Sequence, residues 1–253
     1  MNARPDFRQR ATDAEQMDRA DCDLQTLHRT LDAFAGINRC FSRLRGPLRR
    51  WVLAPLKAHP PANRPARVLD LGCGACDVPI WLLGEAQRQH IPLEVTALDA
   101  DPRVVAYARS RHGQLSGLQI VLGDATRLAA YAPVDFIIGN HFLHHLDNAA
   151  VTRVLAEARQ QALRGVLFTD LARSRFSYAA FSLLALLFRG SFIREDGLLS
   201  IRKGFRPSDF GRLIDAEGYA VRTAFPGRIL LRGAGSETES ARKHQVAAGA
   251  VGP

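Results

Sequence analysis

Between residues 67 and 172, two patterns of apolar and polar positions alternate along the chain. Short runs rich in Val, Ile, Leu and Phe are typical of buried strands, and the longer stretches between them carry apolar residues at helical spacing. Strand and helix repeated with short connections predict a parallel sheet with helices on both faces. The expected strands are 67–72, 93–100, 118–125, 134–140 and 165–172, and the expected helices are 77–90, 102–111 and 147–163.

Helical spacing also dominates the region ahead of these strands. From Leu24 to about residue 60, the pattern predicts a helical cap of two helices that are broken near Gly46 and Pro47. A proline-rich boundary at 59–66 separates this cap, 24–60, from an expected sheet domain over 66–232.

The region after the fifth expected strand departs from the alternation. Residues 173–204 contain an apolar run at 178–188, so we expect a helical insertion there. A capped helix is expected within 206–218, followed by two final strands at 219–225 and 228–233.

Both ends of the chain are expected to lie outside the folded core. Residues 1–23 are polar and predict a flexible N-terminus, and residues 235–253 predict a disordered tail. The run at 178–188 is too short to cross a ~30 Å hydrocarbon core as a helix, and no apolar leader opens the chain. The sequence predicts a soluble, cytoplasmic protein without a transmembrane segment, and it leaves monomer and homodimer open.

The net charge of +9 changes this picture little. Such a charge is compatible with a nucleic-acid partner, but the basic residues are spread along the chain and favour an arginine-rich solvated surface. Four cysteines in 253 residues do not indicate a disulfide framework.

Candidate chemistry begins in the stretch VLDLGCGACD, residues 68–77. Gly72 and Gly74 follow the first expected strand, and they permit a tight turn that exposes the first N–H groups of the next helix to a ligand. Asp77 is expected to cap that helix. An acid at this point repels a pyrophosphate and suits a ligand with a cationic portion. The C-x-x-C formed by Cys73 and Cys76 has no partner motif for zinc and favours small loop residues over a metal or redox site.

Further polar residues follow the next three expected strands. Asp99 ends the second strand and is placed to accept both hydroxyls of a ribose. Asp124 follows the third strand and is placed to accept from an adenine amino group. All would lie at the carboxyl edge of one sheet, where open α/β folds bind their ligands. The fourth strand is followed by Asn140, His141, His144 and His145.

Taken together, these motifs resemble the class I S-adenosylmethionine-dependent methyltransferases over about 66–232. The LHHL stretch and the N-terminal helices resemble most the ubiquinone- and menaquinone-biosynthesis-like enzymes, and the segment from FTDLARSRFSY to GFRPSDF resembles small-molecule methyltransferases associated with polyketide synthases. The resemblance implies a Rossmann-like α/β fold with a seven-stranded, mostly parallel sheet, an antiparallel last strand, N-terminal helices and a helical lid insertion at about 173–204.

The resemblance also implies S-adenosylmethionine as cofactor and S-adenosylhomocysteine as product. By this resemblance, Asp70, Gly72 and Gly74 hold the methionine moiety of the cofactor. Ala100 packs on the adenine, and Asn140 contacts the methionine part. One departure is Cys76, which stands where the family usually has a third glycine, and its side chain is expected to crowd the methionine end. The implied cofactor-binding set is Asp70, Gly72, Cys73, Gly74, Asp99, Ala100, Asp124, Ala125 and Asn140.

The acceptor is expected to be a small aromatic or phenolic, polyketide or quinone-like molecule that is methylated on oxygen or carbon. Removing its proton calls for a base near neutrality, and His144 or His145 is the candidate; one of them could instead pack under the loop. The apolar insertion could form acceptor walls or simply pack against the N-terminal helices. The candidate acceptor contacts are His141, Tyr178, Phe181 and Arg173, and no metal is expected.

Two alternatives from other classes stay open. A nucleic-acid methyltransferase would explain the charge, but Asn140 is followed by His141 and Phe142 without the prolines that base-methylating enzymes often carry there. A non-catalytic, methyltransferase-like binding subunit would explain Cys76. We expect a small-molecule acceptor and no nucleic-acid substrate.

Overall fold

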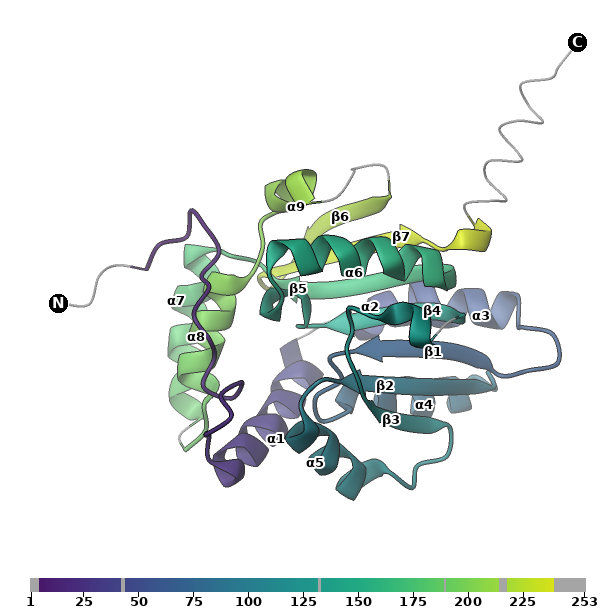
Figure 1. Cartoon of the computed structure of the whole chain (residues 1–253), viewed down its shortest axis with the longest axis horizontal. Helices are drawn as coiled ribbons and strands as arrows, with labels where there is room; N and C mark the ends of the chain where they lie inside the picture. Colours follow the sequence, from purple (N-terminus) through teal and green to yellow (C-terminus); the bar gives the residue numbers. More distant parts are fainter. Residues whose placement is uncertain (1–4, 42–43, 132, 189, 214–217, 239–253) are drawn as a thin grey trace, which may run out of the picture.

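The computed structural model describes residues 5–41, 44–131, 133–188, 190–213 and 218–238. Its centre is a seven-stranded sheet in the order β3-β2-β1-β4-β5-β7-β6 (Figure 1). Neighbouring strands from β3 to β5 pair in parallel, whereas β7 is antiparallel to both β5 and β6. This confirms the predicted fold. The strands are β1 (Ala66–Leu71), β2 (Leu93–Asp99), β3 (Leu118–Leu122), β4 (Val134–Asn140), β5 (Ala162–Leu171), β6 (Tyr219–Ala224) and β7 (Arg228–Ala234).

The strand order fixes where a ligand can enter. The chain runs outward from β1 through β2 to β3, and it then returns to the other side of β1 to form β4 and β5. The connections that follow β1 and β4 therefore lead to opposite faces, which opens a crevice at their carboxyl ends.

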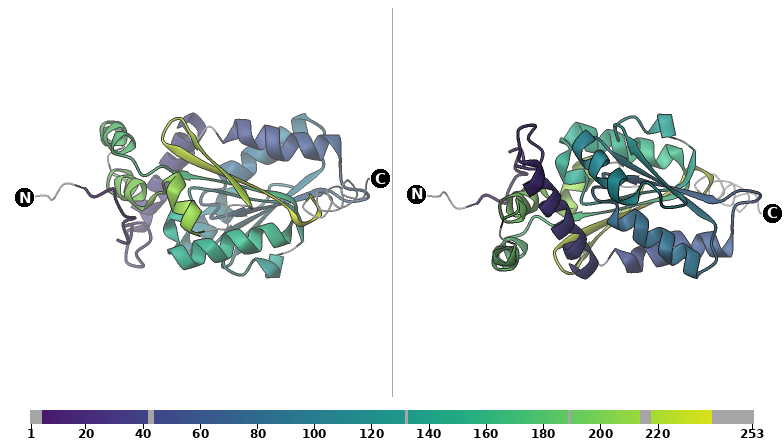
Figure 2. Two further views of the ribbon diagram at one scale, coloured as in Figure 1. Left: turned by 90° about the horizontal axis from the view of Figure 1, so that it is seen from above. Right: turned by 90° about the horizontal axis from the view of Figure 1, so that it is seen from below.

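Helices cover both faces of this sheet (Figure 2). Successive strand residues point to opposite faces, so Val68 packs under α4 and the turns of α2 and α3, while Leu69 packs on the α6 side. The helices are α1 (Leu24–Phe41), α2 (Arg45–Leu48), α3 (Ala54–Ala58), α4 (Asp77–Arg88), α5 (Pro102–His112), α6 (Asn148–Gln161), α7 (Arg175–Leu184), α8 (Ile193–Lys203) and α9 (Pro207–Leu213).

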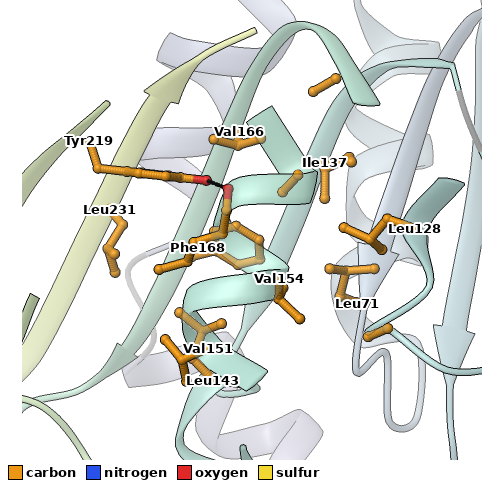
Figure 3. Close-up of a cluster of buried hydrophobic side chains, with 14 of the residues drawn as sticks. Leu71, Leu128, Ile137, Leu143, Val151, Val154, Val166, Phe168, Tyr219 and Leu231 are labelled. Atoms are coloured by element: carbon orange, nitrogen blue, oxygen red, sulfur yellow. Dashed lines mark hydrogen bonds between the residues drawn. The ribbon is translucent and has the colours of Figure 1, made fainter. Parts of the chain in front are cut away.

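The core on the α6 side is the larger one, and Figure 3 shows part of it. Phe168 from β5 lies fully buried between Val154 of α6 and Leu231 of β7 in this cluster. At its rim, the hydroxyl of Tyr219 donates to the backbone oxygen of Leu155 at 2.8 Å, which satisfies the one polar atom of that ring. This packing anchors β6 and β7 to the parallel part of the sheet.

Element boundaries differ from the sequence expectation at two points. β5 begins at Ala162, three residues before the predicted strand, because α6 ends at Gln161 and passes directly into it. In the cap, the second helix begins at Arg45, so Pro47 lies in its first turn, where a proline needs no N–H. The predicted break at Gly46 and Pro47 is therefore wrong, because both residues lie within α2, and residues 42–43 lie outside the described ones.

The N-terminal segment 5–23 contains no helix or strand, yet it packs against the helices beyond the sheet (Figure 1). Phe7 and Glu15 are buried, and Asp196 of α8 accepts the backbone N–H groups of Gln16 and Met17 at 2.7 and 2.9 Å. The expectation of a flexible segment over 1–23 does not describe this packing, because its polar backbone is satisfied by α8. The expected tail lies mostly outside the described residues.

The helices α1, α7 and α8 and the segment 5–23 gather beyond the carboxyl ends of the parallel strands (Figures 1 and 2). They cover the crevice that the strand order opens. In the described part of the chain, every helix is too short or too polar to cross a membrane.

Candidate functional site

A cavity of about 630 Å³ lies between this edge of the sheet and the covering helices. Its floor comes from the turns that follow β1, β2 and β4, and its walls come from α1, α7, α8 and the segment 5–23. The predicted residues that line it are Asp70, Gly72, Cys73, Gly74, Asp99, Ala100, Ala125, Asn140, His141, His144, His145 and Phe181. Three other predicted residues within the described chain, Asp124, Tyr178 and Arg173, lie outside it.

The glycine turn after β1 is shaped by contacts on one side and space on the other. Gly72 and Cys73 donate their N–H groups to the Leu98 oxygen at 2.9 and 3.0 Å. A Cβ on Gly72 would lie 2.7 Å from the Phe142 ring, whereas a Cβ on Gly74 would meet nothing within 4 Å. Both glycines have positive φ, 67° and 52°. Gly74 thus leaves room for a ligand to approach the backbone directly.

Cys76 also adopts the left-handed conformation, with φ of 62°, and is the residue before α4. Its side chain is fully buried with Cys73, Ala97 and Val105, and its sulfur lies 3.7 Å from that of Cys73. Because this backbone geometry points the thiol into the core, Cys76 is not among the residues that line the cavity. The expected crowding of a cofactor by Cys76 is therefore wrong.

Asp77 is the first residue of α4 and does not cap it. It lines the cavity, and the side-chain amide of Asn38 on α1 donates to its Oδ1 at 3.5 Å. The predicted capping role fails because the chain enters α4 through Cys76, whose side chain makes no capping hydrogen bond.

Asp70 and Asp99 place two buried carboxyl groups in the floor of the cavity. Burial, together with repulsion from Asp77 and Asp99, holds the pKa of Asp70 well above its ordinary value. Burial likewise raises the pKa of Asp99, although its carboxylate accepts the N–H groups of Gly74 and Asp101, each at 3.0 Å. Buried carboxyl groups with raised pKa values fit a ligand that brings positive charge.

Asp124 departs from its predicted place. Its Oδ1 accepts the backbone N–H and the hydroxyl of Thr126 at 2.8 and 2.7 Å, and its side chain is 53% exposed. These hydrogen bonds lower its pKa and hold the carboxylate over its own turn. Gly123 and Ala125, on either side of it, line the cavity instead.

His144 lies at the centre of a buried polar chain. Its Nδ1 is 2.7 Å from Asp170 Oδ1, at the end of β5, and its backbone N–H donates to Asp170 Oδ2 at 3.0 Å. Its Nε2 lies 3.7 Å from Glu15 Oε1, which comes from the N-terminal segment. The contact with Asp170 places the proton on Nδ1, so Nε2 is left with a free lone pair on the cavity side.

His145 has a different environment although its ring lies 4.2 Å from that of His144. Its Nδ1 is 3.1 Å from Asp18 Oδ2. Burial lowers the pKa of His145, but the hydrogen bond to Asp18 and the charge of Glu15 outweigh burial and raise it. The raised pKa of His145 favours its protonated form, which is less suited to accept a proton.

Glu15, His144 and His145 also offer three ligand atoms within 4.8 Å of one another, a geometry that could hold a metal ion. However, the ammonium of Lys203 lies 3.1 Å from Glu15 Oε1 and already supplies a counter-charge. A divalent cation would have to displace it or tolerate it as a neighbour, so the donor set does not favour a metal.

Asn140 and His141 extend the floor toward β5. Asn140 Oδ1 accepts the Thr169 hydroxyl at 2.6 Å, and the His141 N–H donates to the Thr169 oxygen at 2.8 Å. Burial, together with the nearby charge of Arg228, lowers the pKa of His141 well below its ordinary value, so its ring is neutral. Its Nε2 is shielded from solvent without a hydrogen-bond partner.

Arg173 and Tyr178, both predicted to contact an acceptor, have structural contacts instead. Arg173 is buried and donates to the backbone oxygens of Phe7 and Gly204 at 3.0 and 2.7 Å, and it pairs with Asp209 at 3.1 Å. The ring of Tyr178 meets the ring of Phe7 edge to face, with centroids 5.5 Å apart. Both residues face the N-terminal segment, which the sequence pattern had not placed there.

Several residues that line the cavity or contact its histidines were missed by sequence reasoning. Asp170 carries the same signal as Asp99, an acid that ends a buried strand, and could have been found by that rule. Glu15 and Asp18 lie in a polar segment without periodicity and gave no signal. Arg228 begins the last strand, where a charged residue is ordinary.

The fold and the position of the cavity define the class of protein. A sheet of this order, with an antiparallel last strand and a glycine turn flanked by buried carboxyl groups, is the Rossmann-like fold of the class I methyltransferases. Residues 68–164 match the family model described as a methyltransferase domain. Together with the fold, this match identifies the chain as an S-adenosylmethionine-dependent methyltransferase with S-adenosylmethionine as its cofactor.

Solved structures share the fold at low identity. A SAM-dependent methyltransferase from Aquifex aeolicus is 15% identical with a TM-score of 0.55, over 81% of this chain and 97% of that one. A protein from Pyrococcus horikoshii is 15% identical with a TM-score of 0.54, over 83% and 98%. An O-methyltransferase from neocarzinostatin biosynthesis, in complex with S-adenosyl-L-homocysteine and 1,4-dihydroxy-2-naphthoic acid, is 19% identical with a TM-score of 0.54, over 81% and 56%. Among curated proteins, no sequence matches this chain.

Proposed function

We propose that this enzyme methylates a hydroxyl oxygen, or an enolate-type carbon, of a small aromatic, polyketide or quinone-like acceptor. The observation that carries the proposal is the composition of the cavity at the carboxyl edge of the sheet. Its floor has the buried carboxyl groups and open glycine turn that fit a cationic donor, and a histidine paired with an aspartate lies beside an apolar wall. Such a cavity brings donor, proton acceptor and apolar acceptor into one enclosed space.

The donor end is formed by the turns after β1 and β2. Asp70 and Asp99 hold the cofactor there through its positive groups and its ribose, and Gly74 lets it lie against the backbone. When bound, the cofactor supplies a methyl group on a sulfonium, and the protein contributes alignment. Because the side chain of Asp124 is directed away, Ala125 and Gly123 are the contacts that remain for the adenine.

The proton of the acceptor hydroxyl is taken by Nε2 of His144. Asp170 keeps the ring in the tautomer with the proton on Nδ1 and stabilises the imidazolium that forms. The carboxylate of Glu15, 3.7 Å from Nε2, adds a second negative charge beside that proton. His145, with its raised pKa and its partner Asp18, is then a neighbour that shapes the pocket and is not the base.

The acceptor end is apolar. Helix α1 contributes Phe34 and Ile37, and the insertion contributes Phe176, Phe181 and Leu184. An aromatic or polyketide-like skeleton buries its surface against these side chains, and their packing excludes water from the reacting atoms. The aromatic hydroxy acid bound to the O-methyltransferase of neocarzinostatin biosynthesis has the size and chemistry that we expect of the acceptor.

The test uses purified protein, S-adenosylmethionine labelled in its methyl group, and a panel of hydroxylated naphthalenes, phenols and polyketides. The expected result is labelled product from at least one phenolic acceptor. His144→Gln should lower kcat by about 10²- to 10⁴-fold, the range for losing a general base, with cofactor affinity unchanged. His59→Gln, at an exposed site away from the cavity, is the matched control and should retain full activity.

Two outcomes overturn parts of the proposal. Full kcat in His144→Gln would remove the base assignment and leave positioning as the source of catalysis. Tight cofactor binding without label on any panel member or in a host extract would favour a non-catalytic binding role.

A further inference from the structure

An arginine with an unused hydrogen-bond donor is buried in the wall of the cavity. Arg228 begins β7, is only 6% exposed, and lines the cavity together with Leu171 and Phe176. Its Nη1 is shielded from solvent and has no hydrogen-bond partner. The other arginine that is buried in the described part of the chain differs: Arg173 is held by two backbone oxygens and Asp209.

Within the described chain, the acid whose charge acts most on Arg228 is Asp170. That carboxylate is already used, because it accepts from Nδ1 and the backbone N–H of His144 and from the N–H of Leu171. Burial lowers the pKa of Arg228 to about 10, so the guanidinium remains protonated at neutral pH. The cavity therefore contains a full positive charge whose donors are incompletely used.

A buried charge without close partners is costly, and proteins keep such groups where a ligand completes them. Resting on the proposed function, we infer that the acceptor carries a carboxylate and that Arg228 binds it. The guanidinium presents a planar set of donors that matches the two oxygens of a carboxylate.

A second unpaired group lies at the same place. His141 Nε2 is shielded and unpartnered, and His141 lines the same cavity as Arg228, whose charge contributes to the lowered pKa of His141. The neutral imidazole can donate from Nε2 to the carboxylate oxygen that the guanidinium leaves open. Arg228 and His141 together form the carboxylate subsite of the cavity.

The strand order separates this subsite from the donor end. Arg228 is on β7, and Asp70 and Asp99 are on β1 and β2, with β4 and β5 between them. With neighbouring strands about 4.8 Å apart, three strand spacings separate β7 from β1, which is roughly 14 Å. The cofactor also has a carboxylate, on its methionine part, but the residues expected to hold that part lie on β1 and β4. The acceptor is thus the source of the anion.

The experiment compares two probes that differ in one group, 3-hydroxy-2-naphthoic acid and 2-naphthol. Binding is measured by calorimetry in the presence of S-adenosylhomocysteine. Wild type should bind the acid about 10- to 100-fold more tightly, as expected for charged hydrogen bonds worth 1.5–3 kcal/mol. Arg228→Gln should lose this preference and keep its affinity for 2-naphthol. Arg232→Gln, on the same strand but exposed, is the control and should keep the preference.

Three outcomes decide against the inference. Equal binding of the two probes to wild type would make Arg228 a structural residue, while intact S-adenosylhomocysteine binding would leave the proposed function standing. A loss of S-adenosylhomocysteine affinity in Arg228→Gln as large as the loss for the acid would assign the subsite to the cofactor. If Arg228→Gln fails to fold, Arg228→Lys keeps the charge without the planar fork, and an unchanged preference for the acid in that variant would overturn the paired geometry.

Discussion

At the scale of single residues, the donor end of the cavity is a place where the protein tolerates unfavourable charge. Asp70, Asp77 and Asp99 lie around one edge, and the charges of Asp77 and Asp99 add to burial in making the ionisation of Asp70 harder. Hydrogen bonds from the backbone stabilise Asp99, whereas Asp70 is fully buried and destabilised. Such an arrangement costs stability in the free protein and becomes favourable only when a cation arrives.

This electrostatic arrangement predicts a pH-dependent affinity. In the free protein, the pKa of Asp70 lies above its ordinary value of 3.8. As the pH rises from that ordinary value through the raised one, the protein must ionise a buried carboxyl group and therefore loses stability. A bound cation favours the ionised form and lowers that pKa. The affinity for S-adenosylmethionine should therefore increase with pH across this pH range, and binding should release a proton from Asp70. Calorimetry in two buffers of different ionisation enthalpy measures that proton.

Asp70→Asn is the variant that isolates this effect. It should bind more weakly, with no proton release from this site and a flat pH dependence in the same window. Proton release that persists unchanged in Asp70→Asn would assign the titration to another group and would remove Asp70 from the donor end.

A second prediction at this scale separates two acids that the sequence treats alike. Asp99→Asn should weaken S-adenosylmethionine binding by about 1–3 kcal/mol, because an NH2 donor replaces one of the two acceptor oxygens and leaves a buried polar partner unsatisfied. Asp124→Ala should leave the affinity unchanged, since its carboxylate is outside the cavity and satisfied by Thr126. Calorimetric titration of both variants with the cofactor is the measurement. Equal losses in the two variants would contradict the geometry described here.

At the scale of elements, the segment 5–23 acts as a wall of the cavity although it has no regular structure. Arginine side chains fix it: Arg173 donates to its Phe7 oxygen, and Arg10 within it donates to the oxygens of Lys203 and Leu146. Its Glu15 and Asp18 then reach the two histidines. The chemistry of the acceptor end thus depends on three parts of the chain that are distant in sequence. They are the segment 5–23, the turn that carries the two histidines, and the region from Arg173 to Lys203 that holds the segment.

Removing the main anchor should loosen this segment. Arg173→Ala strands Asp209 and two backbone oxygens, and we expect the free energy of unfolding to fall by about 3–5 kcal/mol, as for breaking a buried ion pair. Arg175→Ala, two residues later and exposed, should change it by less than about 0.5 kcal/mol. Urea unfolding followed by circular dichroism gives both values. A small loss in Arg173→Ala, matching that of Arg175→Ala, would show that the segment contributes little.

The features that the sequence could predict are those that depend on residues close together in the chain. β1 and β4 are continuous apolar runs that end in polar residues, so both the strands and the edge at which Asp70 and Asn140 lie were readable. The direction in which a loop side chain points could not be predicted from the sequence. Thr126, two residues after Asp124, captures that carboxylate, and no periodicity reveals such a competition between local and ligand contacts.

Contacts across long separations were equally hidden. Glu15 meets His144, and Phe7 meets Arg173 and Tyr178, although each lies in a polar stretch that predicts a loose terminus. These residues are positioned by side chains of α7 and α8, so their place depends on the finished fold. Arg228 was missed for the same reason, because its burial results from the packing of β7 beside β5.

At the scale of the whole molecule, surface and interior carry opposite charge. The chain has a net charge of +9, yet the acids that line the cavity, Glu15, Asp18, Asp70, Asp77, Asp99 and Asp101, outnumber the lining arginine, Arg228. A polyanion is attracted to the outside of such a molecule and repelled from its cavity. A small acceptor with one carboxylate can pass where a phosphate backbone cannot.

This separation predicts that RNA binds without becoming a substrate. Association should come from surface arginines and weaken by more than about tenfold between roughly 50 and 200 mM salt, as counterion release requires. Methyl transfer to a small phenolic acid should continue when RNA is present, because the cavity remains accessible. Filter binding at the two salt concentrations, together with labelled methyl transfer to RNA and to the acid in one mixture, measures both. Label in the RNA, or salt-insensitive binding that blocks methylation of the acid, would place a nucleic acid in the cavity and reverse the assignment of acceptor class.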